Sequence, residues 1–131
     1  MHTLIEDFLS EGPYAVVGAS RNRHKYGNKC LRCYQQAGKE AIPINPQSDE
    51  IEGLKAYPSL SDAPKVRAIS VITPPEVTAE VLREAAELGI RYAWLQPGAE
   101  SSEAYAAVED TDINLIAGGP CLLVALGYRE F

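Results

Sequence analysis

The residues best suited to chemistry lie between Tyr14 and Cys33, in the stretch YAVVGASRNRHKYGNKCLRC. An apolar run breaks at Gly18 and is followed by a polar, positively charged loop and then by a segment of helical periodicity. A strand that turns at a glycine and leads into a helix presents backbone N–H groups to an anion, and the helix dipole favours the negative charge. The pattern therefore predicts a phosphate-binding turn.

The charge of this stretch differs from that of the rest of the chain. The whole sequence has 12 Lys and Arg against 18 Asp and Glu, a net charge of −6, which argues against a nucleic-acid or anionic-membrane partner. Residues 12–39, however, include no acidic residue and six basic ones. A basic segment around the glycine turn favours a local anionic ligand, and solvated surface charge is the alternative.

Cys30 and Cys33 form a CxxC motif, a pattern that occurs in redox-active and metal-binding sites. A reactive CxxC pair sits at the very start of a helix, where the dipole lowers the thiol pKa, whereas these two lie about one turn inside a predicted helix on its apolar stripe. The other Cys and His residues, His2, His24 and Cys121, show no metal-ligand spacing. Packing in the core is the favoured interpretation, with redox and metal roles as alternatives.

The length of 131 residues and the apolar content of 46% indicate a single domain over residues 1–131. The odd number of cysteines gives no disulfide framework and indicates a reducing compartment. We find neither a signal-peptide pattern nor an apolar run of about 20 residues, so we expect a soluble, cytoplasmic protein.

Helical and strand patterns alternate along the chain. Strands are expected over Tyr14–Val17, Glu40–Ile44, Val66–Ile72, Tyr92–Leu95 and Ile113–Ala117, with a short edge strand over Leu54–Tyr57. Helices are expected over Thr3–Leu9, Tyr26–Ala37, from a capping box at Thr73 and Glu76 to Gly89, and from Ser101 or Ser102 to Asp110. This alternation predicts an α/β fold: a three-layer, Rossmann-type, doubly wound parallel sheet in a single domain.

In a sheet of order 3-2-1-4-5 the ligand crevice lies outside the carboxyl ends of the first and fourth strands. The candidate binding residues are Gly18, Ala19, Ser20, Arg21, Arg23, Lys25, Gly27, Asn45, Pro46, Thr73, Pro74 and Pro75. The turn is not a GxGxxG fingerprint, and Asn45 and Pro46 follow the second strand where a dinucleotide site places Asp or Glu. Both features make NAD(P) a less favoured ligand.

Several segments, taken in order, resemble the small stand-alone CoA-binding proteins. They are VVGAS, the helix-entry glycine Gly27, PINP at Pro43–Pro46, EIEGLKAYPSL at Glu50–Leu60 and WLQPG at Trp94–Gly98. The Rossmann fold of that family is similar to the nucleotide-binding domain of the succinyl-CoA synthetase α subunit. The resemblance implies a CoA pyrophosphate at Gly18–Arg21, with Asn45, Pro46 and Thr73–Pro75 lining the crevice toward the adenosine.

The sequence also departs from the family pattern at three places. Ile72 and Thr73 stand where a Phe-Arg pair is common, and Gly119, Pro120 and Cys121 stand where Asp-Arg-Cys is common. Gln47 occupies a position from which a lysine could meet the adenosine 3′-phosphate. These departures concern ligand affinity more than the fold.

The leading hypothesis is a module that binds CoA or an acyl-CoA through its pyrophosphate, without complete catalytic machinery. No Ser-His-Asp or Cys-His arrangement is recognisable, so the chain is more readily interpreted as a binding protein than as an enzyme. The first alternative is an NAD(P)-binding oxidoreductase or a nucleotide-responsive regulator on the same fold. The second is an interaction protein with a vestigial pocket. Homo-oligomer formation is left open.

Overall fold

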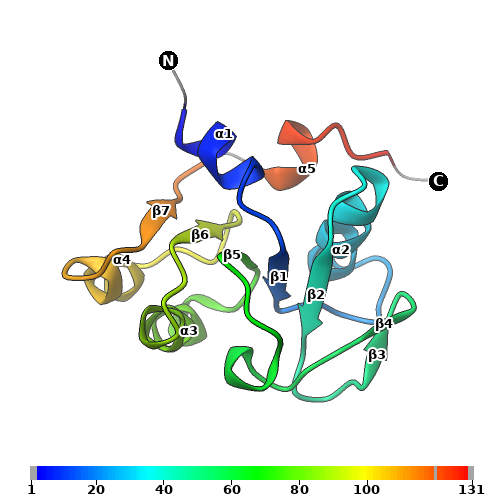
Figure 1. Ribbon diagram of the computed structural model, residues 1–131, viewed down its shortest axis with the longest axis horizontal. Helices are drawn as coiled ribbons and strands as arrows, with labels where there is room; N and C mark the ends of the chain where they lie inside the picture. Colours follow the sequence, from blue (N-terminus) through cyan, green and yellow to red (C-terminus); the bar gives the residue numbers. More distant parts are fainter. Residues whose placement is uncertain (1–2, 120, 130–131) are drawn as a thin grey trace.

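The computed structural model describes residues 3–119 and 121–129 (Figure 1). The helices are α1 (Leu4–Leu9), α2 (Tyr26–Gln36), α3 (Pro75–Glu87), α4 (Ser102–Val108) and α5 (Leu122–Ala125), with a 3-10 turn η1 (Leu60–Asp62). The strands are β1 (Tyr14–Val17), β2 (Ala41–Ile44), β3 (Glu50–Ile51), β4 (Leu54–Lys55), β5 (Ala68–Val71), β6 (Tyr92–Leu95) and β7 (Asn114–Ile116).

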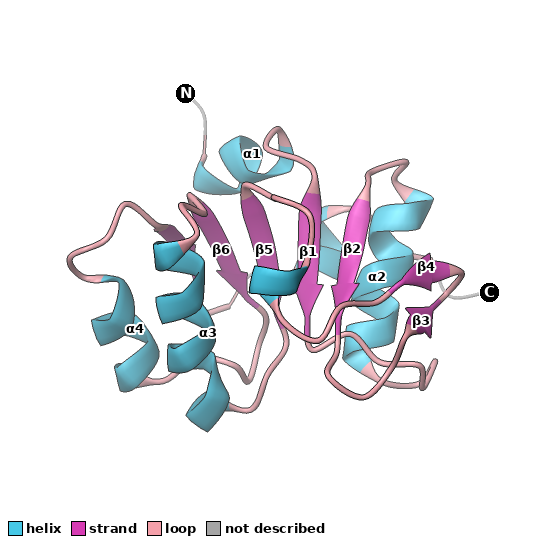
Figure 2. Ribbon diagram, turned by 60° about the horizontal axis from the view of Figure 1, so that its bottom comes forward, coloured by secondary structure: helices cyan, strands magenta, loops and turns pink. Residues whose placement is uncertain are grey.

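Five of the strands form one parallel sheet in the order β2-β1-β5-β6-β7. Helices α3 and α4 cover one face and α2 covers the other, with α5 packed beside α2 (Figure 2). The predicted three-layer, doubly wound parallel sheet is therefore confirmed. Because β1 lies between β2 and β5, and the chain continues from it toward one edge of the sheet through β2 and toward the other through β5, the topological switch point lies at the carboxyl end of β1.

Successive side chains of a β-strand point to opposite faces of the sheet, so each strand contributes side chains to two separate cores. Ala15 and Val17 of β1 pack into the core beneath α3 and α4. Tyr14 and Val16 pack into the core beneath α2, together with the fully buried Trp94. Strands buried on both faces explain why the sequence shows continuous apolar runs rather than alternation.

The predicted edge strand at Leu54–Tyr57 is wrong in its pairing. Leu54–Lys55 pairs antiparallel with Glu50–Ile51 in a separate two-stranded ribbon. Tyr57 reaches the main sheet only as an isolated parallel bridge to Ile44. The residue that follows is Pro58, which has no N–H to extend the pairing, so the sheet ends at β2.

The predicted capping box at Thr73 and Glu76 is also wrong. The N-cap of α3 is Pro74, whose side chain makes no capping hydrogen bond. The hydroxyl of Thr73 instead bonds the hydroxyl of Thr78 at 2.7 Å. Because Pro75 disfavours helical backbone at the residue before it, Pro74 is extended (ψ 146°) and the helix begins at Pro75, which leaves Thr73 one residue too early to cap it.

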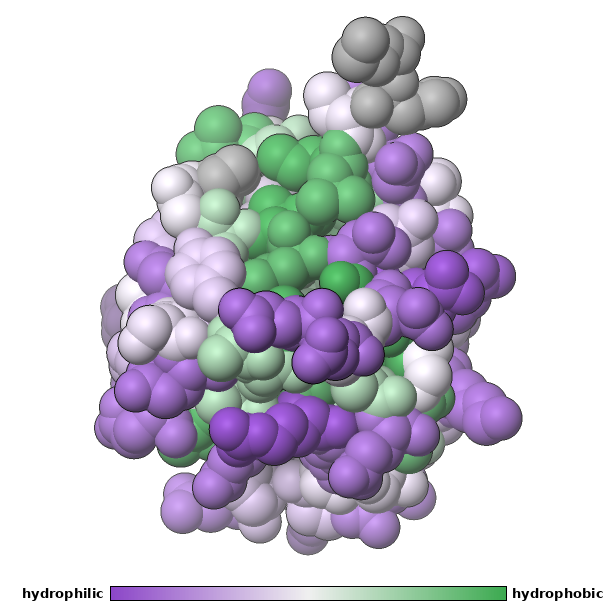
Figure 3. Space-filling model, turned by 90° about the vertical axis from the view of Figure 1, so that its left-hand side faces the viewer, coloured by the Kyte–Doolittle hydropathy of each residue, from purple (hydrophilic) through white to green (hydrophobic). Residues whose placement is uncertain are grey.

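The opposite edge of the sheet, at β7, carries an apolar surface. Figure 3 shows apolar side chains gathered on this side of the molecule. Leu4 of α1, which contacts β7, is 39% exposed, and Leu115 of β7 is half-buried. Within the described residues, no helix is long and apolar enough to cross a membrane.

Candidate ligand-binding cleft

The turn after β1 is closed by two glycines whose lack of a side chain is required by packing. Gly18 has φ of +97°, and a Cβ there would lie 2.2 Å from the carbonyl oxygen of Ile72, just after β5. A Cβ on Gly27, in the first turn of α2, would lie 2.1 Å from the carbonyl oxygen of Gly18. The glycines thus bring the start of α2 directly against the turn, between two strand ends.

A cleft of about 610 Å³ opens at this end of the sheet, between the β1 turn, the loop after β2, the segment after β5 and one side of α3. Figure 2 shows these loops gathered below the carboxyl ends of the strands. Of the candidate residues, those lining the cleft are Gly18, Ala19, Ser20, Lys25, Gly27, Asn45, Pro46, Thr73 and Pro74. Arg21, Arg23 and Pro75 are exposed and lie outside this lining.

Sequence reasoning missed a second group of lining residues: Pro58, Ser59, Val77, Val81 and Glu84. The α3 members repeat at four and then three residues, so they form one stripe of that helix. This stripe was visible in the sequence as the apolar face of a helix, and Glu84 falls on it as a charged residue among apolar ones. A carboxylate on the apolar stripe of this helix was the signal that could have extended the site.

Asn45 fixes the wall of the cleft at the end of β2. Its Nδ2 donates to the carbonyl oxygen of Ala19 at 2.7 Å, and its Oδ1 accepts from the N–H of Gln47 at 2.7 Å. Both ends of the amide are therefore engaged. Asn45 joins the glycine turn to the loop after β2 and so holds two sides of the cleft together.

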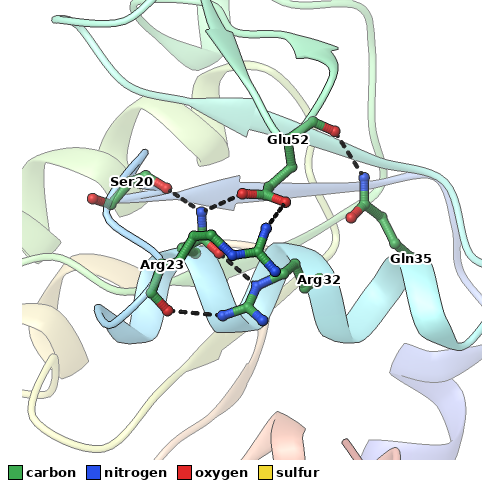
Figure 4. A network of polar contacts seen from close by, with 6 residues as sticks. Ser20, Arg23, Arg32, Gln35 and Glu52 are labelled. Atoms are coloured by element: carbon green, nitrogen blue, oxygen red, sulfur yellow. Dashed lines mark hydrogen bonds and ion pairs between the residues drawn. The ribbon is translucent and has the colours of Figure 1, made fainter. Parts of the chain in front are cut away.

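The basic loop after the turn is held by a carboxylate from the β3–β4 turn (Figure 4). Glu52 accepts from Asn28 Nδ2 at 3.0 Å and pairs with Arg23 at 2.6 Å. The hydrogen bond from Asn28 and the charge of Arg23 lower the pKa of Glu52, against the opposing effect of burial. The positive stretch therefore has an acidic partner in space, and the charge of Arg23 is directed at Glu52 rather than into the cleft.

The same network fixes the backbone of the loop. The Nδ2 group of Asn28 also donates to the carbonyl oxygen of Ser20 at 2.8 Å. Arg32 donates to Asn28 Oδ1 at 2.7 Å and to the carbonyl oxygen of Arg23 at 2.8 Å. Asn28 and Arg32 are both buried, so these bonds are shielded from water and set the path of residues 20–23.

Two helices begin at the cleft without a side-chain cap. The N-cap residues, Lys25 for α2 and Pro74 for α3, both line the cleft and make no capping hydrogen bond. Helices α1 and α4, by contrast, are capped by the hydroxyls of Thr3 and Ser101. The first turn of α2 also has no acidic residue. Uncapped N–H groups and the positive end of the dipole suit an anion.

The CxxC cysteines lie in the core beneath the sheet. Cys30 is fully buried and Cys33 is 1% exposed, and both are free thiols. Burial raises the pKa of Cys33 to about 11 and also raises the pKa of Cys30. No group of three or more potential metal ligands occurs in the described part of the chain. These surroundings favour the packing interpretation over a thiolate role.

We expect the three thiols to differ sharply in reactivity. Cys121 is half-buried, whereas Cys30 and Cys33 are shielded and held protonated. Ellman's reagent should modify Cys121 rapidly in the native protein, and it should modify Cys30 and Cys33 only when the protein unfolds. Cys121→Ser should remove the rapid phase. Two rapid phases in the native protein would contradict the core placement of the CxxC pair.

A parallel, doubly wound sheet with a glycine turn and a cleft at its switch point defines a Rossmann-type nucleotide-binding domain. Residues 13–127 match the family model described as CoA binding domain. The chain belongs to this family.

The relatives include both long enzymes and small proteins. The chain is 33% identical over 102 residues to acetate–CoA ligase [ADP-forming] II of Archaeoglobus fulgidus, covering 76% of this chain but 15% of the ligase. It is 34% identical over 104 residues to the uncharacterised protein YneT of Bacillus subtilis, covering 78% of this chain and 76% of YneT. The structure of a conserved hypothetical protein from Pyrococcus furiosus superposes with a TM-score of 0.81 at 43% identity, covering 86% and 97% of the two chains. The resemblance to small CoA-binding proteins is confirmed.

Proposed function

We propose that this chain binds CoA or an acyl-CoA in the cleft, with the diphosphate against Gly18–Ser20 and the first turn of α2. The observation that carries the proposal is the uncapped start of α2, which opens into a cleft built around Gly18 and Gly27. Membership of the CoA binding domain family supports CoA as the ligand. Lys25, at the N-cap, adds a full positive charge where the diphosphate would lie.

The wall of the cleft at β2 favours CoA over NAD(P). In dinucleotide sites a carboxylate at this place accepts from the ribose hydroxyls. Here Asn45 stands there, and both ends of its amide are already bonded to Ala19 and Gln47. An NAD(P) ligand would therefore lack its usual ribose partner.

The lining also favours binding without a complete catalytic site. Among the described residues that line the cleft, Lys25 and Glu84 carry the ionisable charges, and they come from opposite sides of it. The ADP-forming ligase that this chain resembles is several times longer, and the chain matches 15% of it. We therefore propose a module that holds CoA, with any group transfer requiring residues from elsewhere.

Calorimetric titration with CoA, acetyl-CoA, NAD and NADP tests the proposal. CoA or acetyl-CoA should bind, and Lys25→Gln should weaken binding by about tenfold through loss of one charge-assisted contact. Lys65→Gln is the matched control, because Lys65 lies in the loop before β5, at the other end of the sheet. Binding of NAD alone would favour the oxidoreductase alternative. No heat with any ligand, in folded protein, would favour the vestigial pocket.

A further inference from the structure

The cleft extends well beyond the glycine turn, along the side of α3. Val77 and Val81 line one wall of this arm, and Ile44 and Pro58 line the other. The arm reaches Glu84, which lies nine residues after the start of α3 and thus about 14 Å along the helix axis from the phosphate end. An arm with apolar walls and this reach suits the flat base of an extended nucleotide.

Glu84 is held in place by the 3-10 turn that faces α3. Both the backbone N–H and the hydroxyl of Ser61 donate to Oε2 of Glu84, at 3.3 and 2.6 Å. Glu84 is half-buried and lines the cleft, and none of the hydrogen bonds among the described residues engages its other carboxylate oxygen, Oε1, so this oxygen can accept from a ligand. A fixed carboxylate beside apolar walls selects a base edge that carries an N–H donor.

The ribose side of the cleft has a different character, because its polar residues are uncharged. The loop after β2 contributes Asn45, Pro46 and Gln47. Among the described lining residues the cationic side chain is Lys25, which lies at the phosphate end beside the start of α2. A 3′-phosphate on the ribose would therefore meet amide groups rather than a cation.

We propose that the cleft recognises an adenosine 5′-diphosphate ester by its base, with Glu84 accepting from the 6-amino group, and makes no ionic contact with a 3′-phosphate. The inference rests on the proposed function and adds the ligand class to it. CoA and 3′-dephospho-CoA are then equivalent ligands. Nucleotides whose base presents a carbonyl at this position are rejected, because that oxygen would face the carboxylate.

The test compares three ligands by calorimetry: CoA, 3′-dephospho-CoA and the deaminated, hypoxanthine form of CoA. CoA and dephospho-CoA should bind within about threefold of each other, because no charge-assisted contact to the 3′-phosphate is made. The deaminated form should bind at least about tenfold more weakly than CoA. A larger effect of the 3′-phosphate, or a smaller preference for adenine, would overturn the inference.

Glu84→Gln provides the second arm of the test. A glutamine can still accept from Ser61 through its oxygen, but it presents an N–H donor to the base, so the preference for adenine over hypoxanthine should be lost or reversed. Glu80→Gln is the matched control: the same change on the same helix, outside the lining of the cleft, should keep the full preference. A preference for adenine above about threefold that remains in Glu84→Gln would overturn the role of Glu84. If wild type binds none of the three ligands, the proposed function itself fails.

Discussion

Gly18→Ala is expected to destabilise the fold by about 3 kcal/mol or more. The left-handed backbone alone costs a non-glycine residue about 1 to 2 kcal/mol. The added Cβ would also lie 2.2 Å from the carbonyl oxygen of Ile72, so β1 and β5 would have to separate at their carboxyl ends. Urea unfolding followed by circular dichroism measures the loss, and CoA binding should be lost with it.

Gly98→Ala is the control for this prediction. Gly98 has φ of +99°, close to the φ of +97° at Gly18, but nothing lies within 4 Å of the position of its Cβ. Gly98→Ala should therefore destabilise the fold only by the cost of the left-handed backbone, about 1 to 2 kcal/mol. Equal losses in the two variants would show that the approach of Ile72 is not what requires glycine at position 18.

The fold was accessible from the sequence because its signals are local. Each buried parallel strand appears as a short apolar run, and each helix between strands appears as an apolar stripe, so their alternation identifies the sheet. Gly18 and Gly27 could likewise be recognised from their neighbours in the sequence. Their exact packing partners, such as the carbonyl of Ile72, lie in other strands and leave no mark near Gly18.

The parts of the site that the sequence did not reveal depend on pairs far apart in the chain. Glu52 lies 29 residues from Arg23 and 24 from Asn28, with no periodicity to connect them. Residues 12–39 contain no carboxylate in the sequence, but in the fold the carboxylate of Glu52 packs against them. In the same way Glu84 meets Ser61 across 23 residues, so its place beside the cleft follows from topology rather than from pattern.

Asn28→Asp is expected to destabilise the protein by about 3 kcal/mol at neutral pH, although the side chain hardly changes shape. Asn28 is fully buried and donates to both the carbonyl oxygen of Ser20 and the carboxylate of Glu52. An aspartate would keep the hydrogen bond from Arg32, but it would lose both donors and place a second negative charge against Glu52 in partly buried surroundings that screen it poorly. Chemical unfolding at a series of pH values measures the difference from wild type.

The difference in the free energy of unfolding between wild type and Asn28→Asp should shrink as the pH falls, for two reasons that act in the same direction. In wild type the pKa of Glu52 is lowered from its ordinary value of 4.5, so its stabilising contribution is present above that value and is lost as the pH falls through the lowered pKa. In the variant the two carboxylates repel each other, so protonation of either one relieves part of the penalty.

Asn22→Asp separates this effect from a simple change of charge in the loop. Asn22 is exposed, and its Oδ1 accepts from the N–H of His24, a role that an aspartate oxygen can also fill. It should change the free energy of unfolding by less than about 0.5 kcal/mol. A large loss in Asn22→Asp, or a loss in Asn28→Asp that stays constant down to acid pH, would contradict the role assigned to Glu52. A clear loss of stability in Asn28→Asp with no change in Asn22→Asp would instead show that the path of the loop after β1 depends on a carboxylate supplied from the β3–β4 turn.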